Sequence, residues 1–321
     1  MNELLSYNRR NFLKKAGALG TLAALSPLAS FSQGEAKEVK LTILHTNDVH
    51  SRIEPFPMDG SRMQGLGGAA RRSALIKQIR SEESNLLLLD AGDMFQGTPY
   101  FNLFEGQVEL ELMSKMGYDA GTFGNHEFDN GLEGLLKHFD KAKFPFITSN
   151  YDFSETVLAG KTKEYITFNK SGLKIGVFAV GIKLDGMVDP KNHKGVKYLD
   201  PIEVANRLSK KLKTEEKCDM VICLSHIGYQ YKNDQVSDLV MASQTRDIDL
   251  IIGGHTHTFL EKPTEIRNLD NQVTVVNQMG YGGAYLGRLD FYFDRRRGKL
   301  RYQANHYQLD SFQEADQLMW G

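Results

Sequence analysis

The sequence predicts an α/β fold in which helices cover the faces of β-sheets, and three observations predict it. From Val39 onward, short apolar runs alternate with longer amphipathic stretches. Several of the runs, such as residues 86–89, are apolar at every position, which is typical of strands buried on both faces. Five of the runs lead directly into Asp, Asn or His residues that stand beside small residues.

The apolar runs predict strands, and the amphipathic stretches between them predict helices. In chain order, strands are expected at residues 41–47, 85–93, 119–125, 144–150, 173–181, 220–226, 249–254, 272–280 and 285–293. Helices are expected at residues 69–84, 107–117, 132–143 and 201–217, where apolar residues recur on one helix face. We expect these elements to form one domain, from about residue 38 to residue 315. The basic run Arg295–Arg297 lies between two strand-like runs, which favours a solvated hairpin turn.

Residues 1–32 have the form of a twin-arginine export signal. The pair Arg9-Arg10 precedes an apolar segment, from about Ala16 to Leu28, that is shorter than the roughly 20 residues of a membrane span. We therefore expect export, to the periplasm or beyond, and contact with a membrane only through an uncleaved signal. The alternative is a basic amphipathic start to a cytosolic protein.

The charge of the chain argues against nucleic acid as a partner. The formal net charge is −1 over 321 residues, and the first 32 residues carry four basic side chains against one acidic, so the remainder is mildly acidic. Binding to a nucleic-acid duplex normally requires a basic face.

The residues that follow the five strands are suited to binding metal ions. Asp48 and His50 stand two residues apart, as do His255 and His257, so each pair points the same way on extended backbone. The ends of five strands meet at one edge of an open α/β sheet. The candidate ligands there are Asp48, His50, Asp93, Asn125, His226, His255 and His257. Seven side chains are too many for one ion, but they suit two ions if one carboxylate is shared.

Two divalent ions held by two aspartates and neutral ligands leave a positive site that attracts an anion. Such ions generate hydroxide near neutral pH and stabilise the in-line displacement at a phosphate ester. Imidazole and carboxylate ligands suit Zn, Mn, Fe, Co or Ni. Taken singly, an Asp or His at a strand end is more often a cap or loop residue, and His45, His138, His193 and His306 are expected to be ordinary packing or surface histidines.

The motifs together resemble those of the calcineurin-like metallophosphoesterases, and within them the bacterial 5′-nucleotidase family. The resemblance rests on Asp48-Val49-His50, Gly92-Asp93, Gly124-Asn125-His126-Glu127, His226 and Gly254-His255-Thr256-His257, with the longer stretches LHTNDVHSR, GDMFQGTP and IIGGHTHT. It covers residues from about 40 to 295 and implies a four-layer αββα sandwich of two mixed sheets flanked by helices.

The resemblance also implies a role for each matching residue. Asp48, His50 and His257 would bind one metal, Asp93 would bridge to the second, and Asn125, His226 and His255 would complete the second site. His126 would contact the phosphate and stabilise charge in the transition state. Asp129 would orient His126, and its spacing of three residues allows that contact across a helical turn.

Full-length nucleotidases of this family carry a second, C-terminal domain, and we expect that domain to be absent here. The first expectation is therefore a stand-alone phosphomonoesterase of the 5′-nucleotidase type. The alternatives are the catalytic half of a split nucleotidase that needs a separately encoded C-terminal domain, or a hydrolase of cyclic phosphodiesters or nucleotide-sugars. We expect Phe95, Phe101 and Phe104 to be packing residues, and the alternative is that they stack on a substrate. We expect Arg71 and Arg72 to be solvated at a helix start, and the alternative is that a turn at Gly67-Gly68 brings one of them towards the phosphate.

Overall fold

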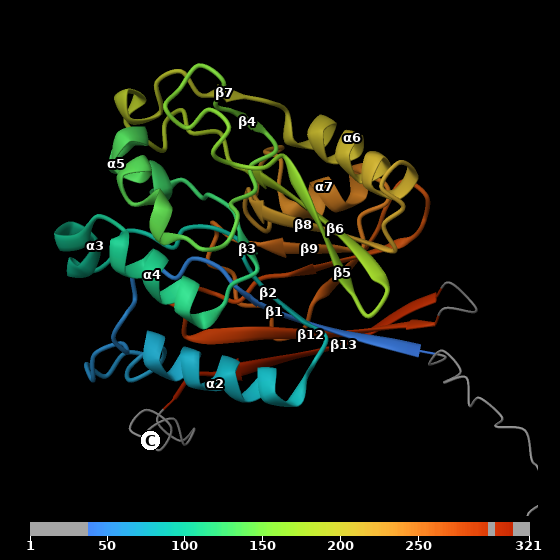
Figure 1. Ribbon diagram of the computed structural model, residues 1–321, viewed down its shortest axis with the longest axis horizontal. Helices are drawn as coiled ribbons and strands as arrows, with labels where there is room; N and C mark the ends of the chain where they lie inside the picture. The colour runs from blue at the N-terminus through green and yellow to red at the C-terminus, as the bar shows by residue number, and fades with distance from the viewer. Residues whose placement is uncertain (1–37, 295–298, 311–321) are drawn as a thin grey trace, which may run out of the picture. The chain divides into compact units, whose positions relative to one another are not determined.

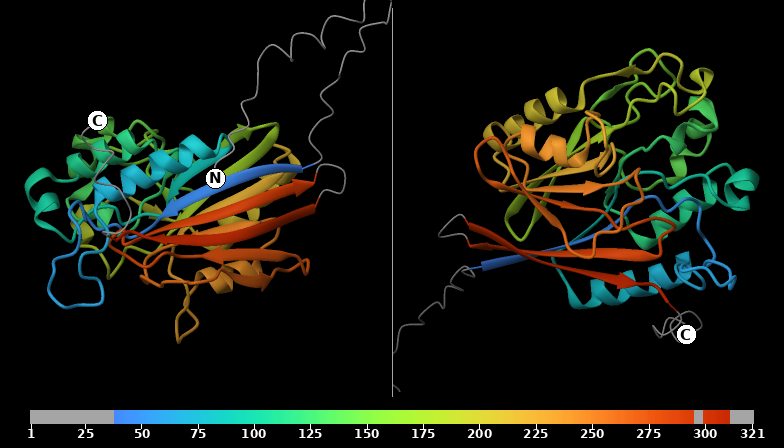
Figure 2. Two further views of the ribbon diagram at one scale, coloured as in Figure 1. Left: turned by 90° about the horizontal axis from the view of Figure 1, so that it is seen from below. Right: turned by 180° about the vertical axis from the view of Figure 1, so that it is seen from behind.

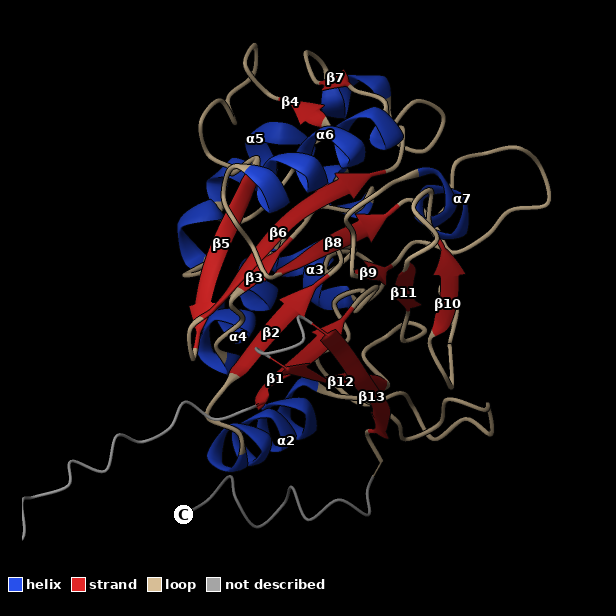
Figure 3. Ribbon diagram, turned by 90° about the vertical axis from the view of Figure 1, so that its right-hand side faces the viewer, coloured by secondary structure: helices blue, strands red, loops and turns tan. Residues whose placement is uncertain are grey.

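A computed structural model describes residues 38–294 and 299–310, which belong to one compact unit. The predicted export signal and the run Arg295–Arg297 lie outside the described residues. Two β-sheets are stacked face to face, and helices cover the outer face of each sheet (Figure 1). Figure 3 shows α2 (Ala69–Glu82) on the outer side of one sheet, and α6 (Pro201–Thr214) and α7 (Asp238–Gln244) on the outer side of the other.

The first sheet has five strands in the order β13-β12-β1-β2-β3. Strands β1, β2 and β3 are parallel to one another, and β12 and β13 complete the sheet as an antiparallel hairpin (Figure 2). The bounds are β1 Glu38–Thr46, β2 Leu86–Asp90, β3 Ala120–Gly121, β12 Tyr285–Asp294 and β13 Lys299–Gln308.

The second sheet has six strands in the order β10-β11-β9-β8-β6-β5. Its four central strands are parallel, and the two edge strands are antiparallel to their neighbours. The bounds are β5 Tyr165–Lys170, β6 Leu173–Gly181, β8 Met220–His226, β9 Leu250–Gly253, β10 Thr264–Arg267 and β11 Val273–Asn277. A separate small sheet pairs β4 (Tyr151–Asp152) with β7 (Lys197–Tyr198).

The helices lie in the segments between strands. The α-helices are α2 Ala69–Glu82, α3 Pro99–Phe104, α4 Gln107–Met116, α5 Gly131–Lys137, α6 Pro201–Thr214 and α7 Asp238–Gln244. Short 3₁₀ turns occur at η1 His126–Phe128, η2 Phe139–Lys141 and η3 Pro190–His193. No helix of the described residues is long and apolar enough to cross a membrane.

The strands alternate their side chains between two apolar layers, which explains the continuous apolar runs. In β2, Leu87 and Leu89 lie in the core between the two sheets, whereas Leu86 and Leu88 pack against the helices of the first sheet. Strand β8 behaves likewise, with its even-numbered apolar residues between the sheets and Val221 and Cys223 under α6 and α7. Three apolar layers therefore hold four layers of secondary structure together, which confirms the predicted αββα fold.

The differences from the predicted elements have local causes. Residues 144–150 do not form a strand, because only Phe146 and Ile147 make isolated bridges, to Gly121 and Lys163. The predicted helix at 132–143 is interrupted after Lys137 and continues as η2. The strands that were not among those expected are the edge strands β5, β10 and β13, whose residues are largely half-exposed or exposed, and the two-residue strands β4 and β7. The helices that were not expected, α3 and α7, have only six and seven residues.

Candidate metal centre

The candidate site lies where the two sheets meet, at the carboxyl ends of β1, β2, β3, β8 and β9. Each of these strands is followed by, or ends in, one or two of the residues singled out in the sequence. Three strands come from the first sheet and two from the second, so the site joins the two halves of the sandwich. The structure brings together all seven predicted side chains: Asp48, His50, Asp93, Asn125, His226, His255 and His257.

Left-handed backbone recurs among these residues. Asp48, His50, Asp93, His255 and His257 have φ angles of 50°, 51°, 55°, 73° and 53°. Such a conformation costs roughly 1–3 kcal/mol for a residue with a side chain, and it persists only where the surroundings impose it. Hydrogen bonds between loops impose it here, since the amides of Asp48 and His50 donate to the carbonyls of Gly92 and Asp93 at 2.9 and 3.0 Å.

One group of ligand atoms comes from Asp48, His50 and His257. His257 Nε2 lies 3.4 Å from Asp48 Oδ1, and His50 Nε2 lies 3.9 Å from the same oxygen. The two imidazole Nε2 atoms are 2.9 Å apart. The carboxylate of Asp48 is fixed by the His255 amide, at 3.0 and 3.1 Å, and by Asn47 Nδ2 at 2.6 Å.

A second group comes from Asp93, His226 and His255. Asp93 Oδ2 lies 3.0 Å from His226 Nε2 and 3.9 Å from His50 Nε2, so this oxygen stands between the two groups. Asn125 Oδ1 joins the second group, at 2.8 Å from His255 Nδ1. Asp93 is thus the residue whose position suits a ligand shared by two ions.

The ligand atoms are arranged to bind cations, because several of their lone pairs point toward one another. His50 Nδ1 lies 3.2 Å from the Gln96 carbonyl oxygen and His226 Nδ1 lies 2.6 Å from that of Ala91, so these nitrogens donate and each Nε2 carries a lone pair. His226 Nε2 is fully buried, has no hydrogen-bond partner in the described part of the chain, and points at a carboxylate. Burial opposes protonation of His226, but the charge of Asp93 raises its pKa to about 10. A positive charge is therefore favoured beside Asp93: a proton on His226 Nε2 supplies it in the absence of metal, and a divalent cation would supply it with the ring neutral.

His126 and Asp129 lie at the edge of this centre. His126 Nδ1 is 2.7 Å from Asp129 Oδ2, and the His126 amide donates to Asp93 Oδ1 at 2.9 Å. Burial opposes protonation of His126, but the hydrogen bond to Asp129 and the charge of Asp93 raise its pKa to about 8. The ring also lies close enough to His50 and Asp93 to form a third cluster of ligand-type atoms with them.

Glu127 is a component of the site that the sequence analysis quoted in a motif but gave no role. Its buried carboxylate accepts four backbone hydrogen bonds, from the amides of Asp93, Met94, Phe95 and Gly124, at 2.6 to 3.1 Å. Three of these donors are in the loop after β2, and one is in the loop after β3. Glu127 therefore ties together the two loops that carry Asp93 and Asn125. Sequence spacing alone gave no sign of these main-chain partners.

Replacement of Gly124 by alanine is expected to abolish metal binding. An added Cβ would lie 2.2 Å from Asp93 Oδ1 and 2.5 Å from His226 Nε2, and neither buried side chain has room to withdraw. Metal content by atomic spectroscopy should fall from two ions per chain to fewer than one. Gly121→Ala is the matched control, because its Cβ would meet nothing closer than 3.5 Å and both ions should remain. Equal metal content in the two variants would contradict this packing argument.

Two packing predictions from the sequence are wrong in part. Arg72 is not solvated but 2% exposed, because it lies under the loop at Gly283, whereas Arg71 donates to the Gly65 carbonyl oxygen. Phe95 and Phe101 are buried as expected, but Phe104 is 44% exposed. The four remaining histidines lie outside the clusters of ligand atoms described above.

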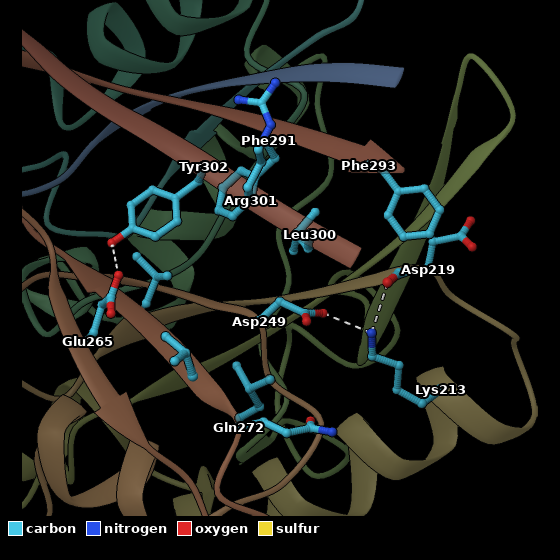
Figure 4. A pocket seen from close by; sticks show the side chains of 13 residues that line it. Lys213, Asp219, Asp249, Glu265, Gln272, Phe291, Phe293, Leu300, Arg301 and Tyr302 are labelled. Carbon is cyan, nitrogen blue, oxygen red and sulfur yellow. Dashed lines mark hydrogen bonds and ion pairs between the residues drawn. The ribbon is translucent and has the colours of Figure 1, made fainter. Parts of the chain in front are cut away.

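A separate cavity of about 630 Å³ lies beside the amino ends of β8, β9 and β11, away from the carboxyl ends that carry the candidate ligands. Figure 4 shows the side chains that line it. Apolar side chains from both sheets line it, including Val273, Phe293 and Leu300. Among its charged groups, Lys213 and Asp249 form an ion pair of 2.9 Å, and Glu265 accepts a hydrogen bond from Tyr302 at 2.8 Å. It shares no residue with the candidate metal centre.

Comparison with known proteins identifies the family. The family model described as Calcineurin-like phosphoesterase matches residues 41–259, which include all seven candidate ligands together with His126 and Asp129. The chain belongs to this family. Its members use two divalent metal ions, in agreement with the number expected from the ligands.

The relatives are nucleotide phosphoesterases. The chain is 35% identical over 288 residues to the trifunctional nucleotide phosphoesterase YfkN of Bacillus subtilis, covering 80% of this chain and 18% of that protein. It is 35% identical over 300 residues to a 5′-nucleotidase of Diplobatis ommata, covering 87% of this chain and 50% of that protein. The solved structure of a 5′-nucleotidase precursor from Thermus thermophilus matches with a TM-score of 0.76 and 31% identity, covering 86% of this chain and 55% of that one. The chain thus spans half or less of the length of these two curated relatives.

Proposed function

We propose that this protein is a dinuclear-metal phosphohydrolase of the 5′-nucleotidase type, which releases inorganic phosphate from nucleoside monophosphates. The observation that carries the proposal is that two aspartates, four histidines and one asparagine lie close together, with Asp93 between two groups of ligand atoms. Two divalent ions held by two carboxylates keep a net positive charge, which selects an anionic substrate.

Each side chain has a distinct part in this proposal. Asp48, His50 and His257 would hold one ion, Asn125, His226 and His255 would hold the other, and Asp93 would serve both. When bound, the ions supply a nucleophile at neutral pH and polarise the phosphoryl group. The protein contributes a fixed geometry, because hydrogen bonds with main-chain groups orient Asp48, His50 and His226 before the substrate arrives.

His126 is proposed to act on the substrate instead of holding metal. Its Nδ1 is engaged by Asp129, which leaves the second ring nitrogen to contact the phosphate. The raised pKa of His126 favours the protonated ring, which stabilises negative charge on the phosphoryl oxygens and donates a proton to the leaving oxygen.

The proposal is tested by a substrate panel measured on the purified chain with Mn, Zn, Co or Ni supplied. AMP and p-nitrophenyl phosphate should be hydrolysed, and chelation should remove the activity reversibly. Cyclic nucleotides and nucleotide-sugars in the same panel test the alternative substrates. Failure to release phosphate from any of these compounds with any of the four metals would overturn the proposal for the isolated chain.

A split nucleotidase is the second candidate. It is considered because this chain aligns with 50% of the Diplobatis ommata 5′-nucleotidase and with 55% of the Thermus thermophilus structure. In that case a separately encoded C-terminal domain would complete the substrate site. The discriminating result is activity that is absent or weak in the isolated chain and restored by the companion domain. Ordinary affinity for AMP in the isolated chain would count against this candidate.

His126→Ala is expected to lower kcat by roughly 10²–10⁴-fold while both ions remain bound, since a proton donor or charge stabiliser is lost and a ligand is not. Steady-state kinetics and metal analysis on the same preparation check the two halves of this expectation. Asp129→Asn should produce a smaller loss, because the histidine remains but is less firmly oriented. Loss of one ion in His126→Ala would assign the residue to the metal ligands.

We also propose that the protein is exported through the twin-arginine pathway. The motive is the pair Arg9-Arg10 followed by a short apolar segment. Fractionation of cells that produce the full chain should place the activity outside the cytoplasm, and Arg9→Lys with Arg10→Lys should retain it inside. Unchanged export of that double variant would refute the pathway.

A further inference from the structure

A row of aromatic rings extends from the candidate metal centre to one side. The ring of Tyr281 stacks on that of His257, with centroids 5.0 Å apart and planes inclined by 13°. Phe56 meets Tyr281 edge to face, at 5.7 Å between centroids. The guanidinium carbon of Arg52 lies 4.2 Å from the centre of the Phe56 ring. We call Tyr281, Phe56 and Arg52 the aromatic shelf.

The aromatic shelf is fixed to the metal centre by the main chain. The Gly282 amide donates to the Asp48 carbonyl oxygen at 2.7 Å, and Asn47 bonds both the Gly280 carbonyl oxygen and the Met279 amide. The ring of Phe56 sits directly on Gly282, where an added Cβ would lie 2.4 Å from it. Tyr281 is therefore held in place by the residues that orient Asp48, which is how a preformed binding surface is built.

Part of the aromatic shelf is available to a ligand. Tyr281 is 37% exposed, and its hydroxyl makes no hydrogen bond with any residue that the structure describes. The side chain of Arg52 forms no ion pair within the described ranges, and its buried Nε has no hydrogen-bond partner there. An exposed ring stacked on a candidate metal ligand, with a cation that forms no ion pair two rings away, is unusual for a surface that only packs.

We propose that Tyr281 is a specificity-determining residue. Its ring would stack on the aromatic group of the substrate while the phosphate of the substrate occupies the metal centre. This inference rests on the proposed function and adds the residue that would select its substrates. Phosphate esters that carry a nucleobase or another aromatic ring would be preferred over aliphatic phosphates. Nucleobases stack well on aromatic side chains such as tyrosine.

Kinetics of Tyr281→Ala with two substrates test the proposal. For AMP, kcat/KM should fall roughly 5- to 100-fold, mainly through KM, because stacking of a base is worth about 1–3 kcal/mol. For glycerol 3-phosphate, which has no ring, kcat/KM should stay within about twofold of the unmodified protein. Tyr281→Phe should retain the preference for AMP. Phe259→Ala is the matched control, because Phe259 is 39% exposed and stacks on Tyr285 without touching His257.

A binding measurement separates this inference from the hydrolytic function. Saturation-transfer NMR with adenosine, in the presence of EDTA, should give a signal for the unmodified protein and a weaker one for Tyr281→Ala. Equal loss of activity on AMP and glycerol 3-phosphate, no loss on either, or no adenosine signal in the unmodified protein would each overturn the stacking role. If the unmodified protein hydrolyses neither substrate, the adenosine experiment alone decides the inference and the hydrolytic proposal fails.

Discussion

Asp93→Ala is expected to remove both metal ions and to lower phosphatase activity by more than about 10³-fold, since metal ions generate the nucleophile and stabilise the displacement. The reason is its position, because Asp93 Oδ2 faces His226 of one ligand group and His50 of the other. Removing it also leaves the buried His226 Nε2 without the carboxylate that faces it. Metal content of the variant by atomic spectroscopy is the decisive measurement.

The result distinguishes a shared ligand from an ordinary one. His257→Ala should lose mainly one ion, because His257 belongs to only one group of ligand atoms. Asp270→Ala is the control for loss of a carboxylate, because Asp270 is an exposed residue paired with Arg246 and should leave both ions bound. If Asp93→Ala keeps one ion, Asp93 serves a single site. If it keeps both, Asp93 is not a ligand.

Glu127→Gln is the second variant for which we expect a large effect, although Glu127 is not among the candidate ligands. The amide nitrogen of glutamine cannot accept hydrogen bonds, so two of the four main-chain donors lose their acceptor. The Asp93 and Gly124 amides share one carboxylate oxygen, and the Met94 and Phe95 amides share the other. An unsatisfied buried amide costs about 1–3 kcal/mol, so we expect a loss of about 2–6 kcal/mol in the free energy of unfolding.

The same substitution should weaken metal binding, because the loop that carries Asp93 loses its anchor to the loop that carries Asn125. Residues that hold metal ligands in place typically contribute roughly 10–100-fold to affinity. Metal titration and chemical unfolding measure the two effects. Glu109→Gln is the matched control, because Glu109 is also buried but its carboxylate oxygens accept no hydrogen bond in the described part of the chain. If Glu127→Gln unfolds and binds metal like Glu109→Gln, the anchoring role is wrong.

Local sequence determined the elements of the fold wherever both faces of a strand are buried. Runs such as Leu86–Leu89 are apolar at every position because alternate residues enter two different cores. The edge strands β5 and β10 escaped prediction because their side chains are half-exposed and their pattern is weak. Residues 144–150 were misassigned because an apolar composition does not say whether a neighbouring strand is available for pairing.

The candidate centre could also be predicted from the sequence, because metal ligands are a few particular residue types and here they follow the ends of strands. Tertiary structure alone decided which side chains meet: that Asp93 lies between two groups, that Glu127 bonds four amides, and that Tyr281 stacks on His257. Contacts at the centre join residues as distant in the chain as Asp48 and His255. They are made by backbone amides and ring faces, which do not differ between residues of the same type, so the sequence carries no sign of them. Sequence therefore specifies the donors, whereas the packing of two sheets specifies their distances and their partners.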